Sequence, residues 1–115
     1  MDLGINSLSI AVKDIEKSKE FYETLGFQPI PDGGSVKENW IIMQNGETRI
    51  GLFQGMFSNN IMTFNPPNAR KIYGRITDAE FDIISASKTI EADSGPCNFM
   101  LADPDGNQIL FDQFE

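Results

Sequence analysis

The chain has 115 residues, 40% of them hydrophobic, which fits one compact domain with a single core. Its formal net charge of -8, from nine basic and 17 acidic residues, disfavours binding to nucleic acid and to anionic lipid. The absence of histidine excludes imidazole-based catalytic triads, the common zinc sites and the two-histidine-one-carboxylate iron site.

Other bulk features point to a cytoplasmic protein. The single cysteine, Cys97, cannot form an internal disulfide, and we expect an inert, partly buried thiol. No apolar stretch approaches the roughly 20 residues of a membrane span, and no basic and apolar leader precedes the first strand. Residues 76–115 hold nine acidic residues and one basic residue, an acidic surface that favours solubility or attracts a cationic ligand.

The first half of the chain predicts a strand, a helix and three strands. Leu8, Ile10 and Val12 alternate with small residues, which indicates a strand. Asp14 is suited to cap a helix over residues 15–25 that ends at Gly26. A strand at residues 27–30 follows, and then an irregular glycine-rich loop at residues 31–35. Two further strands, at residues 40–44 and 48–54, are joined by an Asn45-Gly46 turn.

The second half repeats this order. Pro66 and Pro67 open a predicted helix with one apolar face, formed by Ala69, Ile72, Tyr73 and Ile76. A strand at residues 61–64 precedes this helix, and strands at residues 81–84, 98–102 and 108–114 follow it. The turn from Asp103 to Asn107 joins the last two strands. The two helices match at an offset of 51 and the two turns at an offset of 60, which suggests internal duplication.

Three motifs make the chain recognisable: Val12-Lys13-Asp14-Ile15, the Phe21 to Phe27 segment, and Asp103-Pro104-Asp105-Gly106-Asn107. Together they resemble the vicinal oxygen chelate superfamily, which includes glyoxalase I, bleomycin-resistance proteins, fosfomycin-inactivating transferases and extradiol dioxygenases. The resemblance spans nearly the whole chain. It implies an α+β domain over residues 1–115, made of paired strand-helix-three-strand modules at about 1–57 and 58–115, with curled sheets around an open cup. It also implies a homodimer.

Enzymes of this superfamily hold a metal with four residues on the cup side of four strands. The resemblance places these positions at Ser7, Gly51, Asn60 and Leu110, none of which is a usual ligand of a transition metal. Shifting the alignment by two residues reaches Gln108 and Asp112, and one carboxylate does not hold a catalytic divalent ion. We therefore expect no metal and no cofactor, and neither glyoxalase nor dioxygenase activity of the metal-dependent kind.

Strand alternation also predicts which side chains line the cup. The helix side receives Leu8, Ile10, Val12, Ile61, Ile109 and Phe111. The other side, with the nearby aromatics, provides the candidate ligand-binding residues Ser7, Ser9, Trp40, Arg49, Phe53, Phe57, Asn60, Met62, Phe64, Gln108, Leu110 and Asp112. Arg49 could hold a carboxylate or phosphate, or pair with Asp112 or Glu47. Phe57 lies between the modules, as a lid or a dimer contact.

The leading functional hypothesis is a metal-free, bleomycin-resistance-type homodimer that sequesters a small organic molecule. The acidic last third favours a cationic, aromatic ligand. One alternative is a lyase, isomerase or transferase of the same superfamily that uses Arg49, Asp112 or Tyr73 without metal. Another is a structural or regulatory subunit whose cup is filled by its own side chains.

Overall fold

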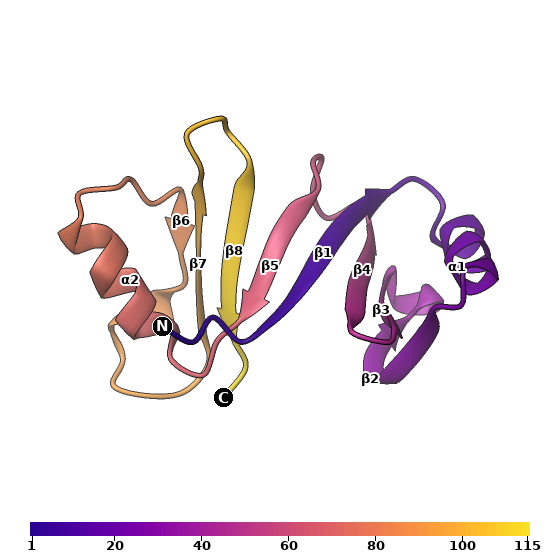
Figure 1. The fold of residues 1–115 in the computed structure, drawn as a ribbon, viewed down its shortest axis with the longest axis horizontal. Helices are drawn as coiled ribbons and strands as arrows, with labels where there is room; N and C mark the ends of the chain where they lie inside the picture. Colours follow the sequence, from indigo (N-terminus) through magenta and orange to yellow (C-terminus); the bar gives the residue numbers. More distant parts are fainter. The chain divides into compact units, whose positions relative to one another are not determined.

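The computed structural model describes residues 1–115 and divides the chain into two compact units. The N-terminal unit comprises residues 7–60, and the C-terminal unit comprises residues 1–6 and 61–115. Each unit combines one α-helix with a mixed sheet (Figure 1), so the α+β prediction is confirmed. The assignment of the whole chain to one domain of two modules stays a prediction.

The N-terminal unit contains most of strand β1, helix α1 and strands β2 to β4. Their bounds are β1 Ile5–Val12, α1 Ile15–Thr24, β2 Gln28–Ser35, β3 Trp40–Asn45 and β4 Thr48–Gln54, with a 3-10 turn η1 at Val36–Glu38. The strand order is β2-β3-β4-β1, in which β1 runs parallel to β4 and the other pairs are antiparallel. Asn45 pairs with Thr48, so Gly46 and Glu47 form the turn, one residue later than predicted.

The C-terminal unit repeats this connectivity. Its elements are β5 Ile61–Asn65, α2 Ala69–Asp78, β6 Ser85–Ala86, β7 Cys97–Ala102 and β8 Gln108–Gln113, with a 3-10 turn η2 at Lys88–Glu91. The order β6-β7-β8-β5 and the parallel β5–β8 pair match the N-terminal unit. Because the helices begin at Ile15 and Ala69, their offset is 54 residues, about one turn different from the predicted 51.

At the start of each helix, two side chains accept hydrogen bonds from backbone amides: an Asp or Asn just before the helix, and a glutamine from the sheet. The carboxylate of Asp14 accepts from the amide of Lys17, and the carboxamide of Asn68 accepts from that of Lys71. A glutamine from the last strand of each unit accepts a further amide: Gln54 from Ile15 at 2.9 Å, and Gln113 from Ala69 at 2.8 Å. These bonds tie each helix start to its sheet and satisfy donors that the helix leaves open.

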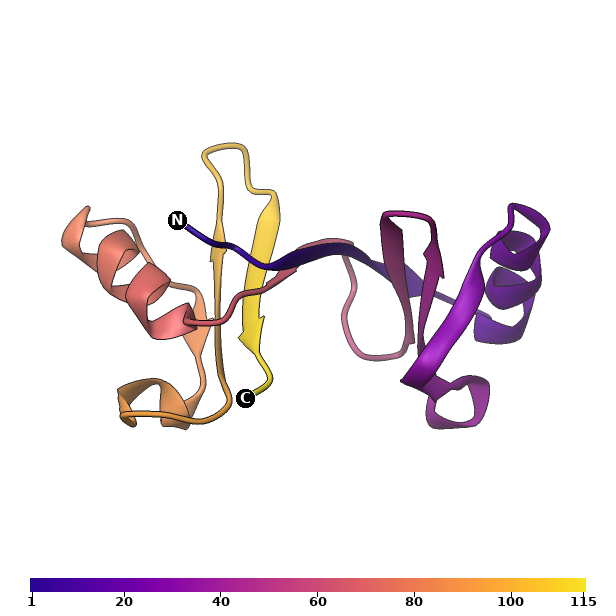
Figure 2. The same ribbon diagram turned by 60° about the horizontal axis from the view of Figure 1, so that its bottom comes forward.

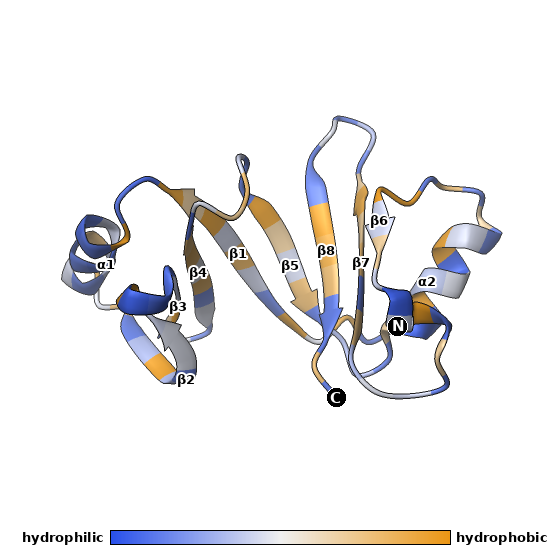
Figure 3. Cartoon of the chain, turned by 180° about the vertical axis from the view of Figure 1, so that it is seen from behind, coloured by the Kyte–Doolittle hydropathy of each residue, from blue (hydrophilic) through white to orange (hydrophobic).

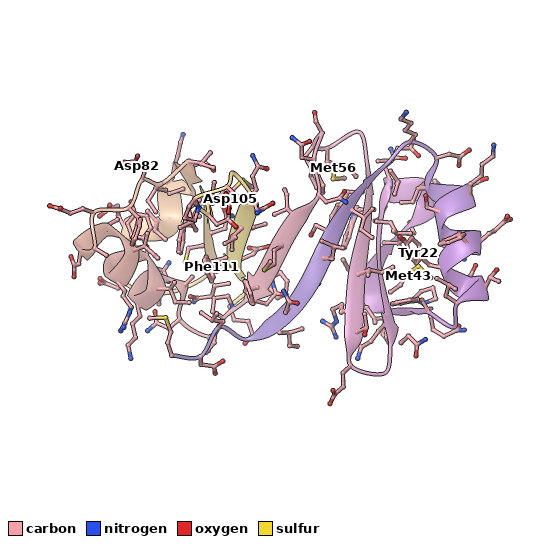
Figure 4. All side chains as sticks on the ribbon, turned by 45° about the horizontal axis from the view of Figure 1, so that its top comes forward. Tyr22, Met43, Met56, Asp82, Asp105 and Phe111 are labelled. Atoms are coloured by element: carbon pink, nitrogen blue, oxygen red, sulfur yellow. The ribbon has the colours of Figure 1, made fainter.

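The core of the N-terminal unit is mainly aliphatic. Ile15 and Tyr22 of α1 pack against one face of β3 and β4 (Figure 4), where the buried residues are Ile41, Met43, Ile50 and Leu52. Phe21 and Leu25 share the predicted helical spacing, but 61% and 54% of their surfaces are exposed. The stripe on α1 is therefore narrower than predicted. Leu8, predicted to pack under the helix, is also exposed.

The core of the C-terminal unit is aromatic. Phe99 is fully buried, with its ring centre 5.0 Å from that of Phe111 and 5.2 Å from that of Tyr73. Phe64 stacks on the other side of Phe111, at 5.5 Å. Ala69 and Ile72 of α2 cover this cluster, and Cys97, predicted to be partly buried, is only 2% exposed. Figure 3 shows the hydrophobic middle of β8 between hydrophilic ends.

Two segments differ from the sequence prediction. Residues 31–35, expected as an irregular loop, belong to β2, whose pairing with β3 is irregular between Pro29 and Gly34. Residues 81–84 do not form a strand, because the chain closes the C-terminus of α2 there. Glu80 takes a left-handed conformation with φ 65°, and the amide of Phe81 donates to the carbonyl of Ile76. No helix in the structure is long and apolar enough to span a membrane.

Candidate functional site

The sheet of the N-terminal unit has one face without a helix, which we call its helix-free face. Figure 2 shows α1 on the other side. Arg49, Gly51 and Phe53 alternate along β4 and share the helix-free face. The register places three residues of β3 directly opposite them, in the pairs Gln44 with Arg49, Ile42 with Gly51, and Trp40 with Phe53. An arginine and two aromatics therefore lie on one face, as predicted for Arg49 and Phe53.

Trp40, Phe53 and Phe57 form a continuous surface that we call the aromatic platform. The rings of Trp40 and Phe53 are nearly parallel, with centres 6.4 Å apart and 9° between their planes. Phe57 follows β4 in the linker and tilts against Phe53 at 5.3 Å. All three side chains are half-buried. The platform thus unites three of the predicted ligand-binding residues, and Phe57 has a partner inside its own unit.

Two glycines allow these rings to lie flat. A Cβ atom at Gly51 would lie 2.5 Å from Cε2 of Phe53. A Cβ atom at Gly34 would lie 2.6 Å from Cδ2 of Trp40, and Gly34 also has a φ of 81°. Any larger residue at either position would push a ring away from the sheet. In the sequence, Gly34 indicated only a flexible loop, so this role was missed.

Arg49 is held by a single neighbour, Gln44. The amide oxygen of Gln44 accepts from Nε at 3.1 Å and from Nη2 at 2.8 Å, so one edge of the guanidinium is engaged. The one ion pair of the structure joins Lys19 to Glu23. The pairing of Arg49 with Glu47, considered from the sequence, is therefore not formed, and the half-buried guanidinium has no anionic partner within its own unit. Its pairing with Asp112 of the other unit stays a prediction.

The other predicted residues of this unit lie near β1. Ser7 and Ser9 are buried, and Ser9 is opposite Gly51 in the parallel β1–β4 pair. Asn60 precedes β5, and its side-chain oxygen accepts from the amide of Ala11 at 3.0 Å. Asn60 therefore attaches the linker to β1, while Ser7 and Ser9 share the face of Gly51.

In the C-terminal unit, the predicted face of β5 is wrong. The register places Met62 opposite Ile109 and Phe64 opposite Phe111, so both lie on the side covered by α2. Phe64 contributes to the aromatic core instead of a ligand surface. Ile61, predicted under the helix, lies on the opposite face. The error has one physical cause, since a one-residue slip in a strand exchanges its two faces.

Gln108, Leu110 and Asp112 do lie on the face away from α2, as predicted, because Phe111 points into the core. The carboxylate of Asp112 is half-buried and accepts no hydrogen bond; its register partner is Asn98. Burial raises the pKa of Asp112 above its ordinary 3.8. Tyr73, in contrast, packs edge-on against Phe99 in the core, which removes it from the candidate catalytic residues.

A hollow that the sequence did not predict lies on the helix side of the N-terminal unit. It has a volume of about 340 Å³ and is lined by Lys13, Asp14, Ile15, Glu16, Val36, Asn39 and Gln54. Its polar groups are partly used within the fold, since Asp14 caps α1 and Gln54 binds the amide of Ile15. The aromatic platform is the more distinctive surface of this unit.

Comparison with known proteins agrees with this architecture. Residues 7–36 match the family model described as bleomycin resistance protein-like N-terminal. No curated protein matches the sequence. A glyoxalase/bleomycin resistance protein/dioxygenase superfamily member from Vibrio splendidus 12B01 superimposes with a TM-score of 0.66, at 18% identity over 94% of this chain and 97% of that one. The chain has the glyoxalase/bleomycin resistance fold. The resemblance to the vicinal oxygen chelate superfamily is thus confirmed for the fold.

Other structures with this fold carry different functions. A methylmalonyl-CoA epimerase from Mycobacterium tuberculosis has a TM-score of 0.72 and 12% identity, over 99% of this chain and 89% of that one. A Legionella pneumophila protein described as NAD-dependent benzaldehyde dehydrogenase has a TM-score of 0.72 and 23% identity, over 96% and 99%. At such identities the likeness establishes the fold alone, so function depends on the site residues.

The metal positions of this fold do not suit a metal here. Gly51 has no side chain, and the ring of Phe53 occupies the space above it. Asn60, expected at the third metal position, precedes β5, and its side-chain oxygen already accepts from the amide of Ala11, while Leu110 has no donor atom. Ser7 supplies only a buried hydroxyl. No three His, Cys, Asp or Glu side chains come together. These residues do not fit a divalent cation.

Proposed function

We propose that this protein binds a small, flat organic molecule on the aromatic platform, without a metal, and sequesters it without chemical change. The stacked Trp40–Phe53 pair on the helix-free face carries the proposal. Aromatic walls with few polar anchors suit planar ligands. The platform is not needed to fill the core of its unit, which is made by aliphatic side chains on the other face.

The metal-free part of the proposal rests on Ser7, Gly51, Asn60 and Leu110, which the resemblance places at the metal positions. Elemental analysis of the dialysed protein tests it directly. We expect no stoichiometric zinc, nickel, iron or manganese, and we expect ligand affinity to be the same with and without a chelator. A metal retained at one equivalent after dialysis would refute this part.

Trp40 makes the binding site easy to observe, because it is the only tryptophan of the chain. A panel of planar aromatic compounds should change Trp40 emission in a saturable way. Each binder should also raise the melting temperature, since a ligand at 100 times its Kd adds about 2.7 kcal/mol of stability. Mass spectrometry of the recovered compound should show no product.

Two phenylalanine variants provide the matched control for this experiment. Phe53→Ala removes the centre of the platform and should abolish the emission change. Phe81→Ala removes an aromatic ring that is 62% exposed and lies outside the platform, and should leave binding unchanged. If no compound binds, or if Phe53→Ala binds as well as the wild type, the proposal is wrong and a subunit filled by its own side chains gains support.

One observation favours an enzyme as the second candidate. The unpaired, half-buried carboxylate of Asp112 has a raised pKa, a property that candidate general bases share. Such an enzyme would convert a bound compound, and Asp112→Asn would stop turnover while retaining affinity. Recovery of product from the wild type, and of unchanged compound from Asp112→Asn, would decide for this candidate.

We also propose that the protein forms a homodimer. Phe114 has 65% of its surface exposed, and we expect a second copy of the chain to cover it. Light scattering should give twice the mass of the chain at micromolar concentration. A monomeric mass for the wild type would contradict the proposal.

A further inference from the structure

Arg49 differs from the other half-buried arginine of the chain in what it binds. The guanidinium of Arg70 donates to the carbonyls of Gly95, Thr89 and Ser94, so it ties together a loop and the η2 turn. The guanidinium of Arg49 donates to one atom only, the amide oxygen of Gln44. Arg70 therefore serves the fold, whereas most of the hydrogen-bonding capacity of Arg49 is unused.

The unused capacity lies on a defined edge. Gln44 occupies the side formed by Nε and Nη2, so Nη1 and the second hydrogen of Nη2 have no partner in the structure. A guanidinium is planar, and fixing one edge orients the whole group. The free edge has the geometry that binds a carboxylate through two parallel hydrogen bonds. Gln44 thus holds Arg49 ready for an anion.

Burial makes a partner for this charge favourable. Arg49 is half-buried, so its guanidinium has lost part of its hydration, and no carboxylate of its own unit compensates for it. Glu47 is close in sequence but lies in the exposed Gly46–Glu47 turn and makes no ion pair with Arg49. An anion from outside the chain would complete the site.

Stacking on the aromatic platform does not by itself supply the binding free energy of a micromolar ligand. Each ring contact on an aromatic side chain contributes about 1–3 kcal/mol, whereas a micromolar Kd needs about 8 kcal/mol. Arg49 lies on the same face as Phe53, four residues away along β4, which corresponds to about 13 Å between Cα atoms. The long arginine side chain can shorten this span. A single ligand can therefore reach both groups.

We propose that the ligand class is a flat aromatic acid, with its ring on the aromatic platform and its carboxylate on the free edge of Arg49. This inference rests on the proposed function and specifies its ligand. It differs from the cationic ligand that the net charge of -8 favours. Long-range attraction is screened beyond about 8 Å in physiological salt, whereas a bidentate contact acts at hydrogen-bond distance.

Calorimetry with three probes of the same shape tests the inference. Biphenyl-4-carboxylate, biphenyl-4-carboxamide and biphenyl-4-methylamine differ mainly in charge at pH 7. We expect the carboxylate to bind about tenfold more tightly than the amide, the difference between a charge-assisted and a neutral hydrogen bond. The amine should bind most weakly. Trp40 emission should change with each bound probe.

Variants of Arg49 separate the anchor from the platform. Arg49→Gln should remove the preference for the carboxylate and leave the affinity for the amide unchanged. Arg49→Lys keeps the charge without the bidentate edge and should retain part of the preference. Arg75→Gln, which removes one exposed positive charge from α2, is the matched control and should behave as the wild type. Thermal unfolding of each variant shows whether it is folded, and Arg49→Lys serves if Arg49→Gln is not.

The possible results test the aromatic-acid ligand separately from the proposed function on which it rests. Equal affinity for all three probes, tightest binding of the amine, or a carboxylate preference that survives in Arg49→Gln would overturn the inference and leave platform binding in place. Failure of all three probes to bind would overturn the proposed function as well. A preference for the carboxylate that is lost only on changing Arg49 supports both.

Discussion

The two units share one connectivity but place the aromatic side chains of their strands on different faces, under the helix in one unit and away from it in the other. In the C-terminal unit, Phe99, Phe111 and Phe64 stack beneath α2 and form the core. In the N-terminal unit, Trp40 and Phe53 lie on the face away from α1, over an aliphatic core. The same framework therefore accepts either kind of core, which leaves Trp40 and Phe53 of the N-terminal unit available for a ligand.

The largest expected contrast between the units comes from removing one ring from each. Phe99→Ala should cost about 3–5 kcal/mol of unfolding free energy, because it leaves a cavity in a fully buried cluster. Phe53→Ala should cost about 1 kcal/mol, because its ring is only half-buried and rests on the outer face. Urea unfolding of both variants measures the difference. Equal losses would mean that the platform is part of a core.

The two glutamines that bind the helix starts should also differ in importance. Gln113 is buried, and its amide bonds to Ala69, Gly95 and Glu115. Gln113→Ala leaves the buried amide of Ala69 unpaired and should cost about 1–3 kcal/mol. Gln54 is half-buried and makes one such bond, so Gln54→Ala should cost about 1 kcal/mol. Thermal unfolding of both variants compares them, and a larger loss for Gln54→Ala would contradict this ranking.

Replacing either of two glycines with alanine should change stability, in opposite directions at the two positions. Gly74 lies inside α2, and a Cβ atom there would meet nothing within 4 Å. Gly74→Ala should therefore stabilise the protein by about 1 kcal/mol. Gly51→Ala should instead displace the ring of Phe53, lower stability and change Trp40 emission. Emission unaltered in Gly51→Ala would show that the platform does not depend on this glycine.

The smallest expected effects concern two carboxylates of the C-terminal unit. Because burial raises the pKa of Asp112, its ionised form destabilises the folded state at neutral pH. Asp112→Asn should then gain a few tenths of a kcal/mol at pH 7, since solvent screens a half-buried charge. The gain should fall as pH decreases through the raised pKa and vanish below about 3.8. Melting temperatures from pH 3 to 7 test this, and a loss at pH 7 would contradict it.

Asp103 provides the control of opposite sign. The side chain and backbone amide of Asn107 hydrogen-bond to its carboxylate and lower its pKa from 3.8. The ionised form therefore stabilises the turn, and this contribution is lost as pH falls through the lowered pKa. Asp103→Ala should reduce the melting temperature at pH 7, and the reduction should become smaller as pH falls below 3.8. A pH-independent difference would exclude ionisation as its cause.

Local sequence signals determined the order of the elements and several of their ends. Asp14 and Gly26 mark the start and end of α1, and the apolar spacing from Ala69 to Ile76 matches the buried face of α2. Strand β4 occupies the predicted residues 48–54. These features depend on hydrogen bonds and backbone conformations within a few residues, so the sequence alone contains them.

Only the tertiary structure decided the faces of β5 and the construction of the site. Met62 and Phe64 were predicted on the wrong side, because pairing with Ile109 and Phe111 of β8 decides which face each residue of β5 takes. The roles of Gly34, Gly51 and Gln44 likewise depend on partners in neighbouring strands. A glycine in the sequence shows where a side chain is missing, but only the packed sheet shows that an aromatic ring fills the space.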